Sequence, residues 1–242
     1  FKGLLYMKQD RHYVLEKNSM MNLIQKPYYK YINKNTNNNS LIAFNDNASA
    51  IKGYNTIILK NNHNPRNNLK YNKIQSKQHF TFKAETHNFP TAISPFPAAE
   101  TGVGGRIRDT ISIGRGGMNI AGTAGYCVGN LNIDNYELDW EDGKYKKGLL
   151  VPADKILIEA SNGASDYGNK IGEPIIGGFT RSFGMDINVG KRVEWIKPIM
   201  FSGGIGFMYD NHITKANTKS NMKIIKIGGD AFKIGLGGST AS

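Results

Sequence analysis

The chain has 242 residues, of which 39% are hydrophobic, and a formal net charge of +12. This length suits one large domain with a substantial core, or one domain plus pieces of its neighbours. No apolar run approaches the ~20 residues of a membrane-spanning helix, so we expect no membrane partner. The single cysteine, Cys127, excludes an internal disulfide framework and a cysteine-based zinc site, and a cytoplasmic location is expected.

Much of the positive charge comes from lysines mixed with asparagines, as in YKYINKNTNNN and KNNHNPRNNLKYNK. This mixture is typical of an AT-rich genome and of exposed loops, so we expect no nucleic-acid partner. A non-catalytic basic protein that binds nucleic acid stays as an alternative. A positive surface also favours small anionic substrates.

The first and last residues both suggest an internal fragment. The sequence begins with FKGLLYMKQDRHY, which has no initiator methionine and no secretory pattern. It ends with GLGGSTAS, which stops inside a glycine-rich motif. We therefore expect further sequence on both sides.

In chain order, the first predicted elements are a helix and two short strands. The helix lies in KNSMMNLIQKPYYKYI, where Pro27 is expected to break or restart it. A strand in SLIAFNDNASAI runs into Asp46 and Asn47, which suit a turn or a helix cap. TIIL predicts a second strand, and the polar residues 60–77 are expected to form an exposed insertion.

A period-two pattern in HFTFKAETH predicts a strand with two different faces. The residues expected to face the core are Phe80, Phe82 and Ala84. The residues expected on the other face are Lys83, Glu85 and His87. A spacing of ~6.6–6.8 Å between alternate residues places these three polar groups in one line.

The segment that follows is rich in proline and glycine and is expected to be mostly loop. The prolines from Pro90 to Pro97 would remove donors from a strand ladder, and glycines recur from Gly102 to Gly129. TAGYCVGNLNI predicts a buried strand, and LLVPADKILIEAS a further strand region. SNGASDYGNKIGEPIIGGF predicts turns and the start of a helix. This mixture of strands and helices predicts the α/β or α+β class.

The candidate site consists of Lys83, Glu85, His87, Arg108 and Asp109. Two carboxylates from separate segments can hold Mg²⁺, which prefers oxygen ligands and keeps waters and phosphates as the others. The lysine and the arginine can neutralise phosphate oxygens, and glycine-rich TGVGGRIRD lets backbone N–H groups approach phosphates. Histidine, whose ordinary pKa is near neutral, is the natural proton acceptor.

The same residues also fit a simpler interpretation. A K-x-E-x-H alternation is typical of a solvated strand face, and glycine clusters are typical of turns. The Walker A pattern of phosphate-binding loops is absent. Only the combination of these features in one stretch favours a functional site.

The stretch KAETHNFPTAISPFPAAETGVGGRIRD, followed by GRGGMNIAGTAGYCVGNL, resembles the large, glutamine-dependent type of phosphoribosylformylglycinamidine synthase. The resemblance continues through WEDG, ASNGASDYGNKIGEP, EWIKPIMFSGGIG and KIGGDAFKIGLGGSTAS, and covers nearly the whole chain. It implies a ligase of purine biosynthesis that forms a C–N bond. In this family ATP activates the amide oxygen of formylglycinamide ribonucleotide, and ammonia from glutamine displaces the phosphate to give formylglycinamidine ribonucleotide.

The resemblance also implies a role for each site residue. His87 matches the proton acceptor, Lys83 an ATP contact, and Glu85 and Asp109 the magnesium ligands. The residues that match the ATP-binding segment are Ala98, Ala99, Glu100, Thr101, Gly102, Val103, Gly104, Gly105, Arg106, Ile107, Arg108 and Asp109. The residues that match the substrate-binding positions are Thr86, Asn88, Phe89 and Arg108.

The sequence departs from the family pattern at three positions. Phe89 stands where many members have a second histidine, so any role of that imidazole is lost. Glu100 stands where a small or hydroxyl residue is common, and it adds negative charge beside the expected phosphate site. Ser239 interrupts a run of three glycines.

The fold implied by the resemblance is that of the aminoimidazole ribonucleotide synthetases. Residues 1–39 would be a connector with a helix, 40–221 the N-terminal-like domain, and 222–242 the start of the C-terminal-like domain. The strands would pair with a second copy later in the same chain, and a glutaminase domain would follow Ser242. The alternatives are another ATP-dependent synthetase of this superfamily and the basic nucleic-acid-binding protein.

Overall fold

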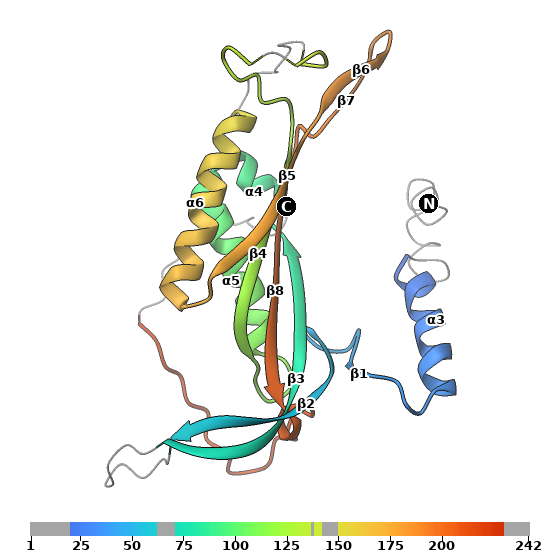
Figure 1. Ribbon diagram of the computed structural model, residues 1–242, viewed down its shortest axis with the longest axis vertical. Coiled ribbons are helices and arrows are strands. Elements are labelled where there is room, and N and C mark those ends of the chain that lie inside the picture. The colour runs from blue at the N-terminus through green and yellow to red at the C-terminus, as the bar shows by residue number, and fades with distance from the viewer. Residues whose placement is uncertain (1–19, 62–70, 137, 142–149, 230–242) are drawn as a thin grey trace.

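The computed structural model describes residues 20–61, 71–136, 138–141 and 150–229. Its centre is a six-stranded sheet in the order β1-β2-β3-β8-β4-β5, in which only β4 and β5 run parallel (Figure 1). The strands of this sheet are β1 (Ser40–Ile42), β2 (Ser49–Asn61), β3 (Tyr71–Thr86), β4 (Met118–Val128), β5 (Ile175–Ser182) and β8 (Ile199–Tyr209). The expected mixed α/β class is confirmed.

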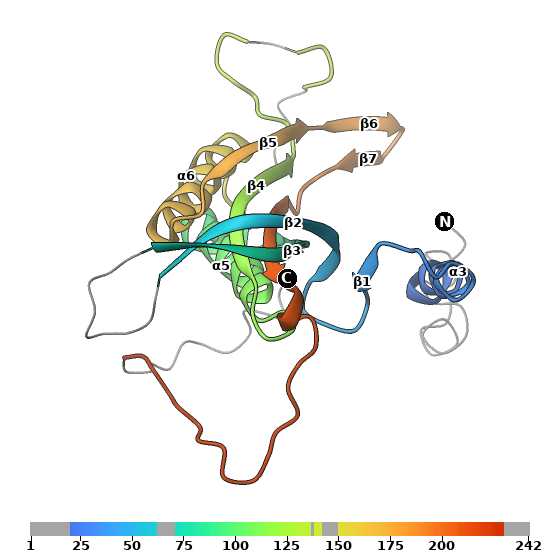
Figure 2. The same cartoon turned by 60° about the horizontal axis from the view of Figure 1, so that its bottom comes forward.

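Three helices pack on one face of the sheet: α4 (Asn88–Ile93), α5 (Pro95–Ile111) and α6 (Ala153–Ile171) (Figures 1 and 2). α6 joins β4 to β5, because parallel neighbours need a long crossover connection. α5 and α6 approach so closely that a Cβ at Gly163 would lie 2.1 Å from the carbonyl oxygen of Phe96. The main core contains Ala99, Val103, Ile107, Ala124, Tyr126, Ala160, Ala164 and Met200.

The remaining elements lie at the periphery of the sheet. They are α3 (Met20–Lys34), the two-stranded hairpin of β6 (Gly184–Asn188) and β7 (Lys191–Glu194), and the short 3₁₀ helix η1 (Asp210–His212). Among the described helices, none combines the length and the apolar character that crossing a membrane requires.

The other face of the sheet is open within the described part of the chain. The period-two alternation of β3 is confirmed, but the expectation that its phenylalanines face the core is wrong. Phe80 and Phe82 are 41% and 42% exposed, whereas the intervening Thr81 is fully buried. The reason is that α5 covers the face that carries Thr81 and Lys83.

The segment expected to be a loop between residues 90 and 109 is helical instead. Pro95 occupies the first turn of α5, where a missing N–H costs nothing because that position has no intrahelical acceptor. The glycines of this segment bring the helix close to its neighbours: a Cβ at Gly104 would lie 2.8 Å from the ring of Tyr167. The strand expected in LLVPADKILIEAS is also wrong, because α6 begins at Ala153.

Two smaller expectations also change. Pro27 lies inside a continuous α3 rather than breaking it. The insertion expected at 60–77 is shorter, since β2 extends to Asn61 and β3 begins at Tyr71. The buried strand predicted from TAGYCVGNLNI is confirmed up to Val128, where β4 ends. The expected domain boundaries stay predictions, and residues 230–242 lie outside the described residues.

A fully buried ion pair connects α5 to the start of β5. Arg106, on α5, is 0% exposed and pairs through Nη1 with Oε1 of Glu173, which is 1% exposed. Its Nε donates to Ser202 Oγ on β8 at 3.4 Å. The guanidinium packs against the sheet backbone, where a Cβ at Gly204 would lie 2.4 Å from Arg106 Nη1. Glycine at this position therefore makes room for a buried cation.

Glu173→Gln should lower the free energy of unfolding by about 3 kcal/mol or more, because a buried guanidinium would lose its charged partner. Urea denaturation followed by circular dichroism measures the change. Glu159→Gln is the matched control, since Glu159 is exposed on α6, and it should change stability by less than about 0.5 kcal/mol. Equal stabilities of the two variants would show that the pair does not hold the core together.

Candidate active site

A lysine between two carboxylates forms the centre of the candidate site. Lys83 and Glu85 lie on the same face of β3 because alternate strand residues point the same way. The ammonium of Lys83 lies 2.8 Å from Glu85 Oε1 and 3.0 Å from Asp109 Oδ2. Asp109 comes from the C-terminal part of α5, so the cluster joins a strand to a helix.

Contacts within this cluster favour the charged forms of Asp109 and Lys83. Burial would raise the pKa of Asp109, but its interactions with Lys83, Glu85 and Asn47 together outweigh burial and hold that pKa below its usual value. Burial would lower the pKa of Lys83, but its bonds to Glu85 and then Asp109 raise it instead. The distances agree with the expectation from the sequence that Lys83, Glu85 and Asp109 lie close together.

Two further residues contact Oδ1, the other carboxylate oxygen of Asp109. Arg108 reaches Asp109 Oδ1 through Nε at 3.3 Å and Nη2 at 3.2 Å, while remaining mostly exposed. Asn47 donates from Nδ2 to the same oxygen at 3.4 Å. Asn47 was expected only in a turn or a helix cap, because no pattern in the sequence indicates that this segment folds back onto a residue 62 positions later.

His87 lies at the other end of the same line of residues, between β3 and α4. Its backbone N–H donates to the Met200 carbonyl at 2.9 Å, and its carbonyl accepts from Thr91 Oγ1. A Cβ at Gly102 would lie 3.0 Å from the His87 Cβ, so α5 packs directly on this residue. Burial lowers the pKa of His87, with a smaller opposing effect from the backbone of Ala98. Its buried Nδ1 has no hydrogen-bond partner among the described residues. A neutral imidazole suits a proton acceptor.

The expected ATP-binding segment is a helix, so its backbone N–H groups after the first turn are used within α5. The expectation of a phosphate-binding backbone loop is wrong for that reason. The residues of this segment with buried side chains or Cα atoms are Ala98, Ala99, Gly102, Val103, Arg106, Ile107 and Asp109. One stripe remains accessible, formed by Thr101, Gly105 and Arg108 at helical spacing. Glu100 faces Lys170 at 3.5 Å, which offsets its extra negative charge.

The expected substrate-binding residues surround His87. Thr86 is exposed at the end of β3, and Phe89 is half-buried in the first turn of α4. Asn88 accepts the backbone N–H of Met200 through Oδ1 at 3.1 Å, so it holds α4 against β8. These residues are therefore adjacent to the candidate proton acceptor.

Two carboxylates are the metal-ligating groups that this part of the chain offers. No group of three or more histidine, cysteine, aspartate or glutamate side chains gathers among the described residues. Glu85 and Asp109 nevertheless converge, since both contact the same ammonium. One or two carboxylates, with waters and phosphates, are the ligands that Mg²⁺ ordinarily takes. The donor set therefore fits magnesium.

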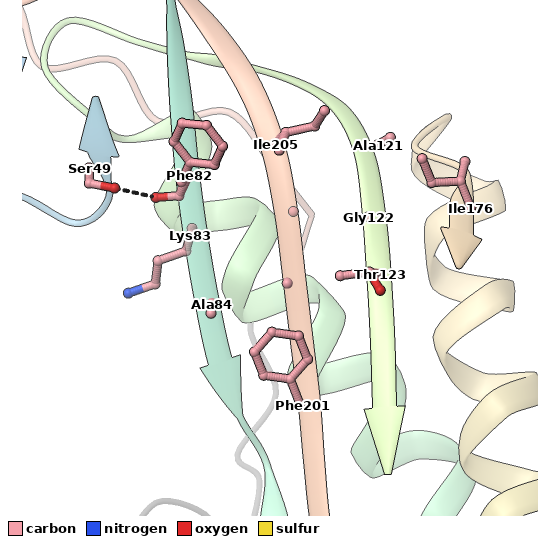
Figure 3. A pocket seen from close by; sticks show the side chains of 12 residues that line it. Ser49, Phe82, Lys83, Ala84, Ala121, Gly122, Thr123, Ile176, Phe201 and Ile205 are labelled. Atoms are coloured by element: carbon pink, nitrogen blue, oxygen red, sulfur yellow. Dashed lines mark hydrogen bonds between the residues drawn. The ribbon is translucent and has the colours of Figure 1, made fainter. Parts of the chain in front are cut away.

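An apolar hollow of about 590 Å³ lies on the open face of the sheet (Figure 3). Its lining includes Phe82, Ile176, Phe201 and Ile205, which Figure 3 shows around the exposed strands. Alternation along β3 places this hollow on the opposite face from the Glu85 carboxylate. Its apolar lining suits another apolar surface better than it suits phosphates.

The described part of the chain is thus an α/β domain on which two carboxylates, a lysine and a histidine lie close together. No family model matches the chain. The phosphoribosylformylglycinamidine synthase of Dictyostelium discoideum is 56% identical over 209 residues, which are 84% of this chain and 15% of that protein. The synthase of Homo sapiens is 49% identical over 210 residues, which are 86% of this chain and 16% of that protein.

The chain therefore belongs to the phosphoribosylformylglycinamidine synthase family. It spans about one sixth of the length of the curated relatives it matches. Among solved structures, "T. maritima PurL complexed with FGAR" is 25% identical over 55% of this chain and 16% of that chain, with a TM-score of 0.35.

The lowered pKa of His87 predicts a specific acid sensitivity. Below the ordinary pKa of 6.5 the unfolded chain takes up a proton at this residue, while the folded chain resists doing so. Stability from His87 is thus present above pH 6.5 and is lost as the pH falls. His87→Asn should reduce the loss of stability between pH 7.5 and pH 5.5, measured from urea midpoints at both pH values. An unchanged pH dependence would contradict the assigned shift.

Proposed function

We propose that this chain carries part of the synthetase active site of a phosphoribosylformylglycinamidine synthase. The reaction is the ATP-dependent amidination of formylglycinamide ribonucleotide to formylglycinamidine ribonucleotide, with ammonia derived from glutamine. The observation that carries the proposal is the 49–56% identity over about 85% of the chain to synthases of this name. The cluster of Lys83, Glu85 and Asp109 beside His87 supports it.

In this proposal the cationic groups bind the phosphates of ATP. Lys83 already stands at the site with a raised pKa, so it remains an ammonium at neutral pH. Arg108 is exposed next to it and offers a planar guanidinium that can bind phosphate oxygens in bidentate fashion. The accessible stripe of Thr101 and Gly105 lets a phosphate approach the helix surface closely.

The chemistry consists of two displacements. The amide oxygen of the ribonucleotide attacks the γ-phosphorus of ATP, and the bond to ADP breaks. Ammonia then attacks the activated carbon, and phosphate leaves with the former amide oxygen. His87, held neutral by burial, accepts the proton that the attacking nitrogen loses. Thr86, Asn88 and Phe89 line the substrate beside it.

Glu85 and Asp109 would hold Mg²⁺, whose positive charge would offset the charge that develops on the transferred phosphoryl group. Both carboxylates contact the ammonium of Lys83, so their oxygens converge on one point at which a cation can bind. When ATP binds, its phosphates can replace the carboxylates as the partners of the Lys83 ammonium. The chain's own contribution is thus to keep charged groups in position before the nucleotide arrives.

The proposed partners follow from the share of the relatives that this chain spans. The relatives are more than six times as long as the matched segment, so a second synthetase half and a glutaminase domain are proposed as neighbours. The second half would cover the open sheet face around Phe82 and Ile205, which is apolar and exposed. We further propose that the enzyme works in the cytoplasm.

His87→Ala in the native-length protein should lower the rate of ammonia-dependent ADP release about 10²–10⁴-fold, the usual contribution of a general acid–base group. Lys83→Met should also reduce the rate, mainly through weaker binding of ATP. Lys155→Met is the matched control for the lysine, since Lys155 is exposed on α6, away from the cluster. Undiminished amidination by His87→Ala, measured from formylglycinamidine ribonucleotide formed, would exclude the assigned role.

A further inference from the structure

Three segments of the chain meet at the carboxylate of Asp46, beside the residue that contacts the candidate metal ligand Asp109. We call this meeting point the Asp46 junction; its members are Asp46, Gly114 and Lys215. The Asp46 carboxylate is 8% exposed and receives Lys215 Nζ on Oδ1 at 2.6 Å and the Gly114 N–H on Oδ2 at 3.0 Å. Lys215 also donates to the carbonyl of Ser112, just after α5, at 3.2 Å.

Apolar packing holds the same three segments together. Ala48, just after the Asp46 loop, is buried in a cluster with Ile113, next to Gly114. Met208 of β8 belongs to this cluster, and Ile213, two residues before Lys215, packs against it. The loop, the turn after α5 and the segment after β8 thus share one small core.

The backbone of the junction is shaped for these contacts. Gly114 has a φ of +54°, and a Cβ there would lie 2.2 Å from the carbonyl oxygen of His212. Phe44 has a φ of +64°, which is uncommon for a residue with a side chain, and its ring packs edge-on against Tyr28 at 5.2 Å. A loop that holds such a conformation is fixed by its surroundings.

The junction is connected to the candidate site by one residue. Asp46 Oδ1, which receives Lys215, also accepts the backbone N–H of Asn47 at 2.8 Å. The side chain of Asn47 then donates to Asp109 Oδ1 at 3.4 Å. Burial would raise the pKa of Asp46, but hydrogen bonds from Lys215, Gly114 and Asn47 lower it, so the carboxylate stays charged.

We propose that Lys215, acting through Asp46, positions Asn47 against Asp109 and thereby tunes how the Glu85–Asp109 pair binds a divalent cation. Lys215 and Asn47 are positioning residues; neither need touch the substrate. The inference rests on the proposed function, because it takes Asp109 as a metal ligand. The segment after β8, which carries Lys215, would then help to determine the geometry of the site.

The physical reason is the cost of leaving the carboxylate of Asp46, whose side chain is 8% exposed, without its charged partner. Without the ammonium of Lys215, a buried carboxylate loses its main counter-charge, and the loop lowers its free energy by moving the group towards water. Asn47 would move with it, and Asp109 would lose a hydrogen-bond donor that orients its carboxylate. Such outer partners of metal ligands typically change metal affinity by about 10–100-fold.

The test uses Lys215→Met in the native-length protein, with Mn²⁺ as the probe. The dissociation constant of Mn²⁺, measured by electron paramagnetic resonance without nucleotide, should rise about 10-fold or more. Hydrogen exchange at the amides of Asn47 and Gly114, both of which donate to Asp46, should become faster. Asn47→Ala should weaken Mn²⁺ binding to a similar degree, and the double variant should be no weaker than the single ones.

Two lysine variants serve as controls. Lys215→Arg keeps the charge and should restore Mn²⁺ binding and slow exchange. Lys219→Met removes an exposed lysine from the same segment and should change neither measurement.

The outcomes separate the inference from the proposed function. Faster exchange in Lys215→Met with unchanged Mn²⁺ binding would overturn the inference, because the junction would then be only structural. Absence of Mn²⁺ binding by the unaltered protein would overturn both the metal site and the inference. Mn²⁺ binding that depends on Lys215, in a protein that lacks amidination activity, would support the inference and contradict only the proposed function.

Discussion

The ammonium of Lys83 is the contact on which the arrangement of the site depends. It lies within 3.0 Å of one carboxylate from β3 and one from α5, and it offsets the repulsion that two close negative charges would otherwise have. Because Asp109 is fixed to the helix, the same contact sets the position of α5 along the strand. The accessible stripe of Thr101, Gly105 and Arg108 is positioned as a consequence.

The sequence predicted the polar side of this arrangement but not its surroundings. Alternation placed Lys83, Glu85 and His87 on one face, and the structure agrees. Alternation says that the two faces of a strand differ, however, and does not say which of them a helix covers. The phenylalanines were therefore assigned to the core, although α5 covers the charged face and leaves Phe80 and Phe82 exposed.

The proline- and glycine-rich segment shows why local signals failed. Proline is tolerated in the first turn of a helix, and glycine is used where two elements approach closely, so neither residue proves a loop. Once the segment is known to be helical, its two arginines separate at once. Arg106 and Arg108 are two residues apart, about 200° around the helix, so one is buried against Glu173 and the other reaches solvent.

This separation bears on how the site is assembled. The charged face of β3 finds its partners within the chain, through α5 and the Asp46 junction, whereas the apolar face around Phe82 and Ile205 finds none among the described residues. An apolar sheet face of this kind is ordinarily covered by another surface. If the proposed second half of the synthetase supplies that cover, it would fix the strand that carries Lys83 and Glu85 from behind. Coverage of the sheet and alignment of the charged groups would then be one event.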